Sequence, residues 1–231
     1  MAGVHWAAKQ CHLGRQKGEL AASLACFRHR RYYFTMTAAK KLKPISVADY
    51  LAGELISPIK QEYLGGVVYA LAGARNAHNV VSGNAFGSLH HRLRGKRCQP
   101  FNSDTKVRVH LPNQVRFYYP DAMVVCRPNP RDDSFQDEPA VLAEVMSRST
   151  RRIDDGEKKD AYLTIPSLSV YLLVEPDQPA VVAYRRTPQG FVRELYEGLA
   201  AVIPLPEIET ELPLAEIFEH VEFIPEPEEE S

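Results

Sequence analysis

Cysteines and long apolar runs are scarce in this chain of 231 residues. The four cysteines, Cys11, Cys26, Cys98 and Cys126, lie far apart and form no CxxC pair. That spacing disfavours a zinc site and a disulfide framework, and it is typical of proteins from a reducing cytoplasm. No run approaches the roughly 18 apolar residues that a membrane span needs. The short apolar stretch at 19–27 is followed by arginines, the wrong order for a secretory signal. We therefore expect a soluble, cytoplasmic protein that does not insert into a membrane.

Positive charge is missing from the C-terminal part, because no Lys or Arg follows Arg193 while glutamates accumulate there. The basic residues gather before Lys43 and again between Arg92 and Arg97. Such clusters are candidate phosphate-binding surfaces, although a solvated charged face explains any one of them equally well. The net charge of −1 argues neither for nor against a nucleic-acid partner.

The chain is long enough for one sizeable core with small appendages. Residues 1–35 show no sustained hydrophobic period, and Met36 starts a stretch that reads like an ordinary N-terminus. We expect residues 1–35 to be a disordered extension, or translation to begin at Met36. Residues 36–223 would form the single domain, and residues 224–231 an acidic, disordered tail.

The hydrophobic pattern predicts helices and strands in alternating groups. A helix at 46–55 has Ser46 and Asp49 as a capping box, and Gly65-Gly66 turns a hairpin at 60–71. A longer helix at 77–94 would be capped by Asn76. Further helices are predicted at 154–164 and 212–221, and strands at 97–101, 105–111, 115–125, 140–146, 168–174, 180–185 and 191–196. This order indicates an α/β or α+β fold, with a mixed sheet flanked by helices.

Two carboxylates stand in or at the end of strand-like apolar runs. Asp121 follows Pro120, and Glu144 lies within the run at 139–145. Burying a single charge costs several kcal/mol or more, but two carboxylates on neighbouring strands can share a divalent cation. Such an ion lowers the pKa of a water and neutralises charge on a phosphate, as phosphodiester hydrolysis requires. Taken singly, Asp121 could be a turn residue and Glu144 a strand-end charge in water.

Other side chains complete this predicted site. Asp154, Lys158 and Tyr162 are spaced by four residues, so they share one helix face, and Lys158 could reach the attacking water. The alternative is a surface ion pair between Asp154 and Lys158. Glu62 and Asp104 are further acidic candidates. His78 could orient a phosphate or be purely structural.

The order of these residues resembles the Uma-type restriction endonuclease family within the PD-(D/E)XK nuclease superfamily. The similarity extends from about residue 44 to 223. It rests on His78, Tyr162, Tyr171 and Val174 and on residues 62–69, 103–107, 119–121, 144–147, 149–150, 154–158 and 165–168.

The resemblance implies a restriction-endonuclease-like fold and cleavage of DNA that depends on Mg²⁺ or Mn²⁺. By position, Asp121 and Glu144 would bind the metal and Glu62 would be an auxiliary acid. The superfamily's lysine two residues after the second acid is replaced by Met146, so Lys158 would serve as a relocated lysine.

A metal-dependent endonuclease acting on DNA is thus the first hypothesis. The second is a nucleic-acid-binding or regulatory protein without catalytic activity, and the third is a metal phosphoesterase that acts on small substrates. We also expect a homodimer, because many nucleases cut both strands as two-fold dimers.

Overall fold

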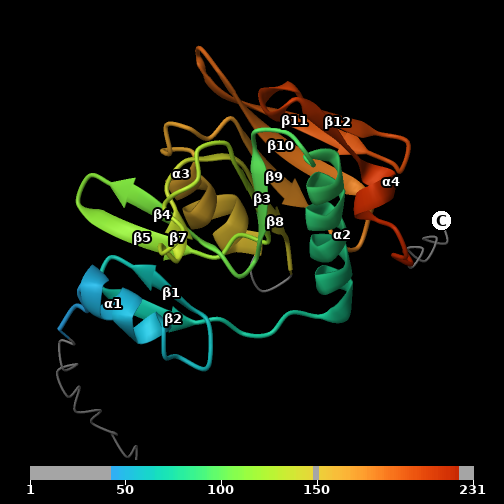
Figure 1. The fold of residues 1–231 in the computed structure, drawn as a ribbon. Coiled ribbons are helices and arrows are strands. Elements are labelled where there is room, and N and C mark those ends of the chain that lie inside the picture. Colours follow the sequence, from blue (N-terminus) through green and yellow to red (C-terminus); the bar gives the residue numbers. More distant parts are fainter. Residues whose placement is uncertain (1–42, 148–150, 224–231) are drawn as a thin grey trace, which may run out of the picture. The chain divides into compact units, whose positions relative to one another are not determined.

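The structure is a computed structural model that describes residues 43–147 and 151–223. The expected extension at 1–35 and the acidic tail at 224–231 lie outside these described residues. The described part has a mixed α+β fold, which confirms the expected fold class (Figure 1). It contains two larger sheets and one small sheet, however, rather than a single mixed sheet.

The first sheet has five strands in the order β2–β1–β5–β4–β7. Its strands are β1 (Gln61–Leu64), β2 (Val67–Ala70), β4 (Lys106–Leu111), β5 (Gln114–Tyr118) and β7 (Phe135–Gln136). β4 and β7 are parallel, and the other neighbours are antiparallel. Helix α1 (Val47–Glu54) adds Tyr50 to a small aromatic core with Tyr63, Phe117 and Phe135.

The second sheet has six strands in the order β11–β10–β9–β8–β6–β3. Its strands are β3 (Gln99–Asn102), β6 (Ala122–Val125), β8 (Pro139–Val145), β9 (Val170–Val174), β10 (Ala180–Thr187) and β11 (Gly190–Glu197). Only β8 and β9 are parallel. These two central strands are nearly continuous apolar runs, as expected for strands buried on both faces.

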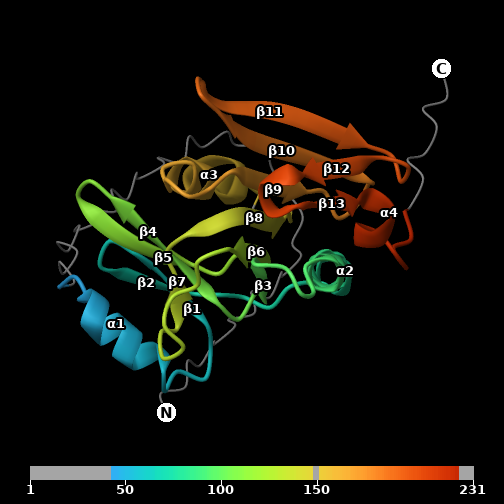
Figure 2. The same ribbon diagram turned by 45° about the horizontal axis from the view of Figure 1, so that its top comes forward.

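Helices cover the two faces of this sheet. α2 (Asn76–Arg92) packs Val81, Ala85 and Leu89 against one face. On the other face, the π-helix η1 (Ile153–Lys158) leads into α3 (Lys159–Tyr162), which packs Ala161 and Tyr162 against the sheet. The remaining elements are β12 (Val202–Leu205), the 3-10 helix η2 (Pro206–Ile208), β13 (Thr210–Pro213) and α4 (Leu214–Ile217). Figure 2 views α2 end-on, with α4 and β13 beside it.

Several predicted boundaries were wrong. The run at 115–125 was predicted as one strand, but it breaks after Tyr118 and supplies β5 and β6 to different sheets. The break coincides with Pro120, which has no N–H for a ladder. Asn76 does not cap α2, because Arg75 holds the cap position without a side-chain hydrogen bond. The closing helix predicted at 212–221 spans only Leu214–Ile217, and β7, β12 and β13 were missed.

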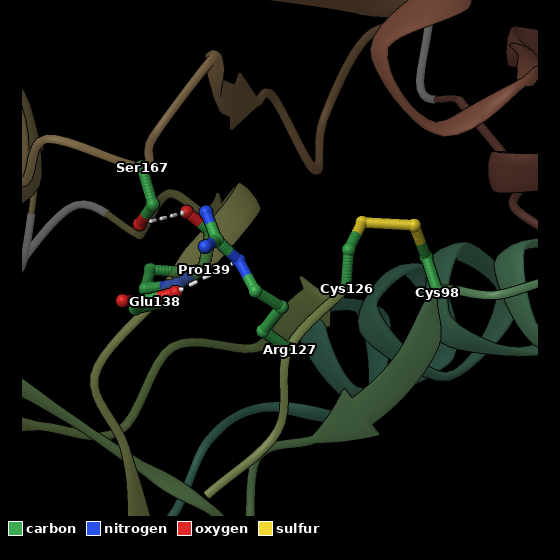
Figure 3. Close-up of a disulfide and its surroundings, with 6 residues drawn as sticks. All are labelled: Cys98, Cys126, Arg127, Glu138, Pro139 and Ser167. Carbon is green, nitrogen blue, oxygen red and sulfur yellow. Dashed lines mark hydrogen bonds and ion pairs between the residues drawn. A yellow bond between two sulfur atoms is a disulfide. The ribbon is translucent and has the colours of Figure 1, made fainter.

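The cysteine prediction was also wrong, because Cys98 and Cys126 form a disulfide (Figure 3). Gln99 at the start of β3 pairs with Val125 at the end of β6, so the two cysteines are the next opposed residues. Antiparallel pairing brings them together across 28 residues of sequence, a proximity that their spacing alone did not reveal. Cysteine spacing therefore no longer supports a reducing compartment.

None of the helices in residues 43–147 and 151–223 has the length and apolarity needed to cross a membrane.

Candidate active site

The two predicted carboxylates meet at one end of the second sheet. β6 and β8 are antiparallel with Ala122 opposite Ala143, so Asp121 and Glu144 come next in register. Directly opposed side chains project from the same face with Cβ atoms about 4.5–5.5 Å apart. The Val145 N–H donates to Asp121 Oδ2 at 2.8 Å, which fixes the Asp121 side chain against β8. The Glu144 carboxylate points towards η1 and α3, where it contacts Lys158 and Tyr162, whereas the Asp121 carboxylate contacts His78 on α2.

Lys158 at the end of η1 is the centre of the buried charge. Its Nζ lies 3.1 Å from Glu62 Oε1, 3.3 Å from Glu144 Oε1 and 3.7 Å from Asp154 Oδ1. The Lys158 side chain is only 9% exposed, and the side chains of its three partners are at most 10% exposed. A surface pair between Asp154 and Lys158 was the alternative prediction, and this burial contradicts it. Because π-helical turns are frequent at functional sites, the unusual winding of η1 fits its role in placing Asp154 and Lys158.

Three tyrosines form hydrogen bonds with residues of this cluster. The Tyr162 hydroxyl donates to Glu144 Oε1 at 2.8 Å, and the Tyr171 hydroxyl donates to the Asp154 carbonyl at 3.0 Å. The Tyr119 N–H points to Glu62 Oε1 at 3.4 Å, so the break between β5 and β6 also contributes to the site. These bonds restrict Glu144 and Glu62 to the positions in which they contact Lys158.

The acidic side chains of the cluster and Lys158 change one another's pKa values. Burial raises the pKa of Glu144 well above its usual value, against the opposing effect of Lys158, and the nearby carboxylates raise it further. Burial alone would lower the pKa of Lys158, but the surrounding carboxylates outweigh burial and raise it. Lys158 is therefore an ammonium at neutral pH. Four acidic side chains, of which Glu144 has a raised pKa, therefore share the site with one ammonium.

His78, in the first turn of α2, contacts the same oxygen of Asp121 that accepts the Val145 N–H. Its Nε2 lies 3.3 Å from Asp121 Oδ2, and both side chains are largely buried. The hydrogen bond to Asp121 raises the pKa of His78, and burial opposes this effect only in part. His78 thus lies at the site and contacts a carboxylate, and its role in orienting a phosphate stays a prediction.

Asp104 is not part of this group of contacts. Its exposed carboxylate pairs with Lys60 at 2.6 Å on the protein surface. Met146, which stands where the superfamily has lysine, is buried in the apolar cluster beneath α3. Asp154, which sequence reasoning treated only as a helix-face neighbour, is a buried third partner of Lys158. Its spacing of four residues before Lys158 was the signal available in the sequence.

The donor groups suit a hard divalent cation. Asp121 Oδ2 and Glu144 Oε1 accept the protein's hydrogen bonds, and the second oxygen of each carboxylate accepts none from the described residues. Within the same residues, no three His, Cys, Asp or Glu side chains are arranged to hold an ion together. Mg²⁺ commonly keeps several waters and uses one or two carboxylates, so a two-carboxylate site fits that ion.

Comparison with known proteins agrees with this architecture. Residues 47–215 match the model of the Uma2 family, described as "Putative restriction endonuclease", and the chain belongs to that family. Two similar proteins come from Synechocystis sp., slr1290 and sll1609, both named as uncharacterized. The first is 32% identical over 147 residues, covering 63% of this chain and 76% of the relative. The second is 30% identical over 143 residues, covering 61% and 80%.

A solved structure has the same fold. It is the crystal structure of "a putative nuclease belonging to DUF820" from Anabaena variabilis, with a TM-score of 0.59 and 19% identity. The match covers 76% of this chain and 98% of that one. The family and the fold together define a nuclease-like protein.

Proposed function

We propose that the chain is a metal-dependent endonuclease that hydrolyses phosphodiester bonds in DNA through a carboxylate-bound Mg²⁺ or Mn²⁺ and an activated water. The observation that carries the proposal is the meeting of Asp121 and Glu144 at one sheet end, with Lys158 buried beside them. The family membership supports a nuclease, and the metal, the mechanism and DNA as substrate are parts of this proposal.

Asp121 and Glu144 would hold the metal through the oxygens that accept no hydrogen bond from the residues that the structure describes. When bound, the ion would lower the pKa of a water and offset charge on the phosphate. Metal-free Glu144 has a raised pKa, so ion binding would also favour its ionised form.

Lys158 would act as a fixed positive charge rather than as a general base. The raised pKa of Lys158 keeps its proton in place at neutral pH, so the ammonium would orient and stabilise the anionic phosphate by charge. Glu62 would position Lys158, and Tyr162 would hold Glu144 Oε1. His78 and Val145 would hold Asp121 Oδ2.

Plasmid nicking tests the proposal. Supercoiled DNA is incubated with the full chain, with and without Mn²⁺, beside Asp121→Ala, Glu144→Ala and the surface control Asp104→Ala. The wild type and the Asp104 variant should nick only with metal, and the two site variants should lose that activity. If the wild type leaves the plasmid intact, or the site variants nick as fast as it does, the endonuclease assignment is wrong.

One observation favours a second candidate, a catalytically silent protein that binds nucleic acid. Lys158 is held by three carboxylates, and Met146 occupies the usual lysine position as part of the core. DNA binding without nicking would indicate this second function.

We also propose that the active form is a homodimer, which light scattering of the full chain would test.

A further inference from the structure

One border of the site carries exposed side chains that the proposed chemistry does not use. It is the continuous stretch from β2 through residues 71–75 to the start of α2. Figure 1 draws this connection in teal, running from β2 to α2. Two exposed residues in this stretch are Tyr69 on β2 and Arg75 directly before α2, and together they are called the β2–α2 lip.

Tyr69 lies beside the catalytic cluster by strand register. β1 and β2 are antiparallel, and Tyr69 is paired directly with Glu62. Opposed residues share a face, with Cβ atoms about 4.5–5.5 Å apart, so Tyr69 stands on the same face as the partner of Lys158. Glu62 is buried, whereas Tyr69 is 50% exposed. A large aromatic ring is thus half in solvent next to the buried charges, on the outer strand of its sheet.

Arg75 is anchored near the site through the first turn of α2. The Asn79 N–H donates to the Arg75 carbonyl at 3.0 Å, and His78, three residues after Arg75, contacts Asp121. The Arg75 side chain is exposed and has no carboxylate partner in the part of the chain that the structure describes. By contrast, Arg92, Arg108 and Arg116 are each paired with an acid. The planar fork of N–H donors on the Arg75 guanidinium matches the geometry of a phosphate group.

We propose that the β2–α2 lip binds the DNA strand beside the cleaved bond. Arg75 contacts a backbone phosphate, and the Tyr69 ring packs on the sugar and base of the neighbouring nucleotide. The inference rests on the proposed nuclease function. DNA is a polyanion, which the buried acidic cluster itself would repel. The lip supplies an exposed cation and an apolar surface for the DNA strand, and the buried site has neither.

Binding of a labelled DNA duplex and of the matching single strand tests the lip, with Glu144→Gln as a non-cleaving parent. Affinity is measured by fluorescence anisotropy between about 50 and 200 mM salt. Arg75→Ala should weaken binding and reduce the slope of log K against log salt by about 0.9, because one phosphate contact is lost. Tyr69→Ala should weaken binding roughly tenfold with an unchanged slope, and Tyr69→Phe should bind like the parent.

Two variants serve as matched controls. Val67→Ala removes an equally exposed side chain from the same face of β2, two residues from Tyr69. Arg193→Ala removes an exposed arginine from β11, in the other large sheet. Both should bind DNA like the parent, and thermal unfolding should be the same for all variants.

The outcomes separate this inference from the function on which it rests. If the wild type nicks DNA but the Arg75 and Tyr69 variants bind like the controls, the lip proposal alone is wrong. If the lip variants lose affinity while the wild type never nicks, the lip is a DNA contact of a non-cleaving protein. If the parent binds neither duplex nor single strand, the lip proposal fails, and plasmid nicking by the wild type then decides the endonuclease assignment separately.

Discussion

Lys158 neutralises carboxylates that come from three different parts of the chain. Glu62 belongs to β1, Glu144 to β8 and Asp154 to the start of η1. Sequence reasoning found Lys158 and Asp154 together because a four-residue spacing marks a shared helix face. It expected Lys158 to reach the attacking water, but it could not foresee that the three acids and Lys158 would be buried together. Burial depends on how the two sheets meet, which local pattern does not encode.

Replacing Lys158 should therefore destabilise the fold as well as the proposed activity. Lys158→Met keeps much of the side-chain volume but leaves buried carboxylates without their cation. Breaking a buried ion pair in this way costs about 3–5 kcal/mol, which urea unfolding at neutral pH would measure. Adding Glu62→Gln should recover part of the loss, because one stranded charge is removed. A double variant no more stable than Lys158→Met would contradict the charge argument.

The adjacent Lys159 is a matched control for this experiment. It pairs with Asp155 at 3.0 Å near the surface, also at a four-residue spacing. Lys159→Met should change the free energy of unfolding by less than about 1 kcal/mol, as exposed ion pairs usually do.

Asp137 provides a pH-dependent prediction remote from the proposed chemistry. Burial alone would raise its pKa, but hydrogen bonds from Arg108 at 2.6 and 2.7 Å and from Asn129 at 2.8 Å lower it. The contribution of this depressed pKa to stability is complete above the usual carboxyl value. It is lost as the pH falls through the lowered folded value. Urea unfolding across acid pH should show wild type more stable than Asp137→Asn near neutrality, with the difference shrinking towards low pH.

The exposed pair Arg127–Glu138 is the comparison for Asp137 (Figure 3). Glu138→Gln should change the free energy of unfolding at neutral pH by less than about 1 kcal/mol, because solvent screens the pair. A difference for Asp137→Asn that stays constant towards low pH would show that the fold does not perturb the Asp137 carboxyl.

Helix α1 shows how well local signals identify a short element. Ser46 caps the helix as predicted, with the Asp49 N–H donating to Ser46 Oγ at 3.1 Å and the Ser46 hydroxyl donating to Asp49 Oδ2 at 2.7 Å. The hairpin predicted at Gly65-Gly66 is also present, and both glycines have the positive φ that such a turn requires, 57° and 104°. In contrast, β7, β12 and β13 have two to four residues each, too few for a hydrophobic period to stand out.

Removal of the cap should weaken α1 and the aromatic core that it covers. Ser46→Ala should cost about 0.5–2 kcal/mol in the free energy of unfolding, because an N–H at the helix start loses its acceptor. Ser82→Ala, a change of the same type in the middle of α2, should be nearly neutral, since Ala is a better helix former there. Chemical denaturation of both variants measures the contrast, and equal losses would argue against capping as the cause.

Assembly of the site depends on contacts between elements far apart in sequence. The pattern identified Asp121 and Glu144 because a charge in a strand-like apolar run is unusual. The division of residues 115–125 between two sheets is what turns Asp121 towards β8, and the sequence indicated it only through Pro120. His78 reaches Asp121 because α2 packs across the second sheet, a tertiary arrangement that no local signal specifies.

The Cys98–Cys126 disulfide should contribute measurably to the stability of the domain. The two cysteines are separated by 28 residues. In the loop-entropy model, a cross-link that closes a loop of this length lowers the entropy of the unfolded chain and so adds about 3–4 kcal/mol to the free energy of unfolding. Urea unfolding with and without a reductant should show that loss in the wild type. The Cys98→Ser variant should be less stable from the outset and insensitive to the reductant, and a reductant effect of equal size in that variant would assign the loss elsewhere.

The same disulfide determines what a cut in the chain would do. It encloses β4, β5 and the turn at Pro112-Asn113 between them, together with Asp121. A protease that cleaved this turn would leave both fragments tied through sulfur. The nicked protein should run as one band on a non-reducing gel and as two after reduction, with Asp121 still held beside Glu144.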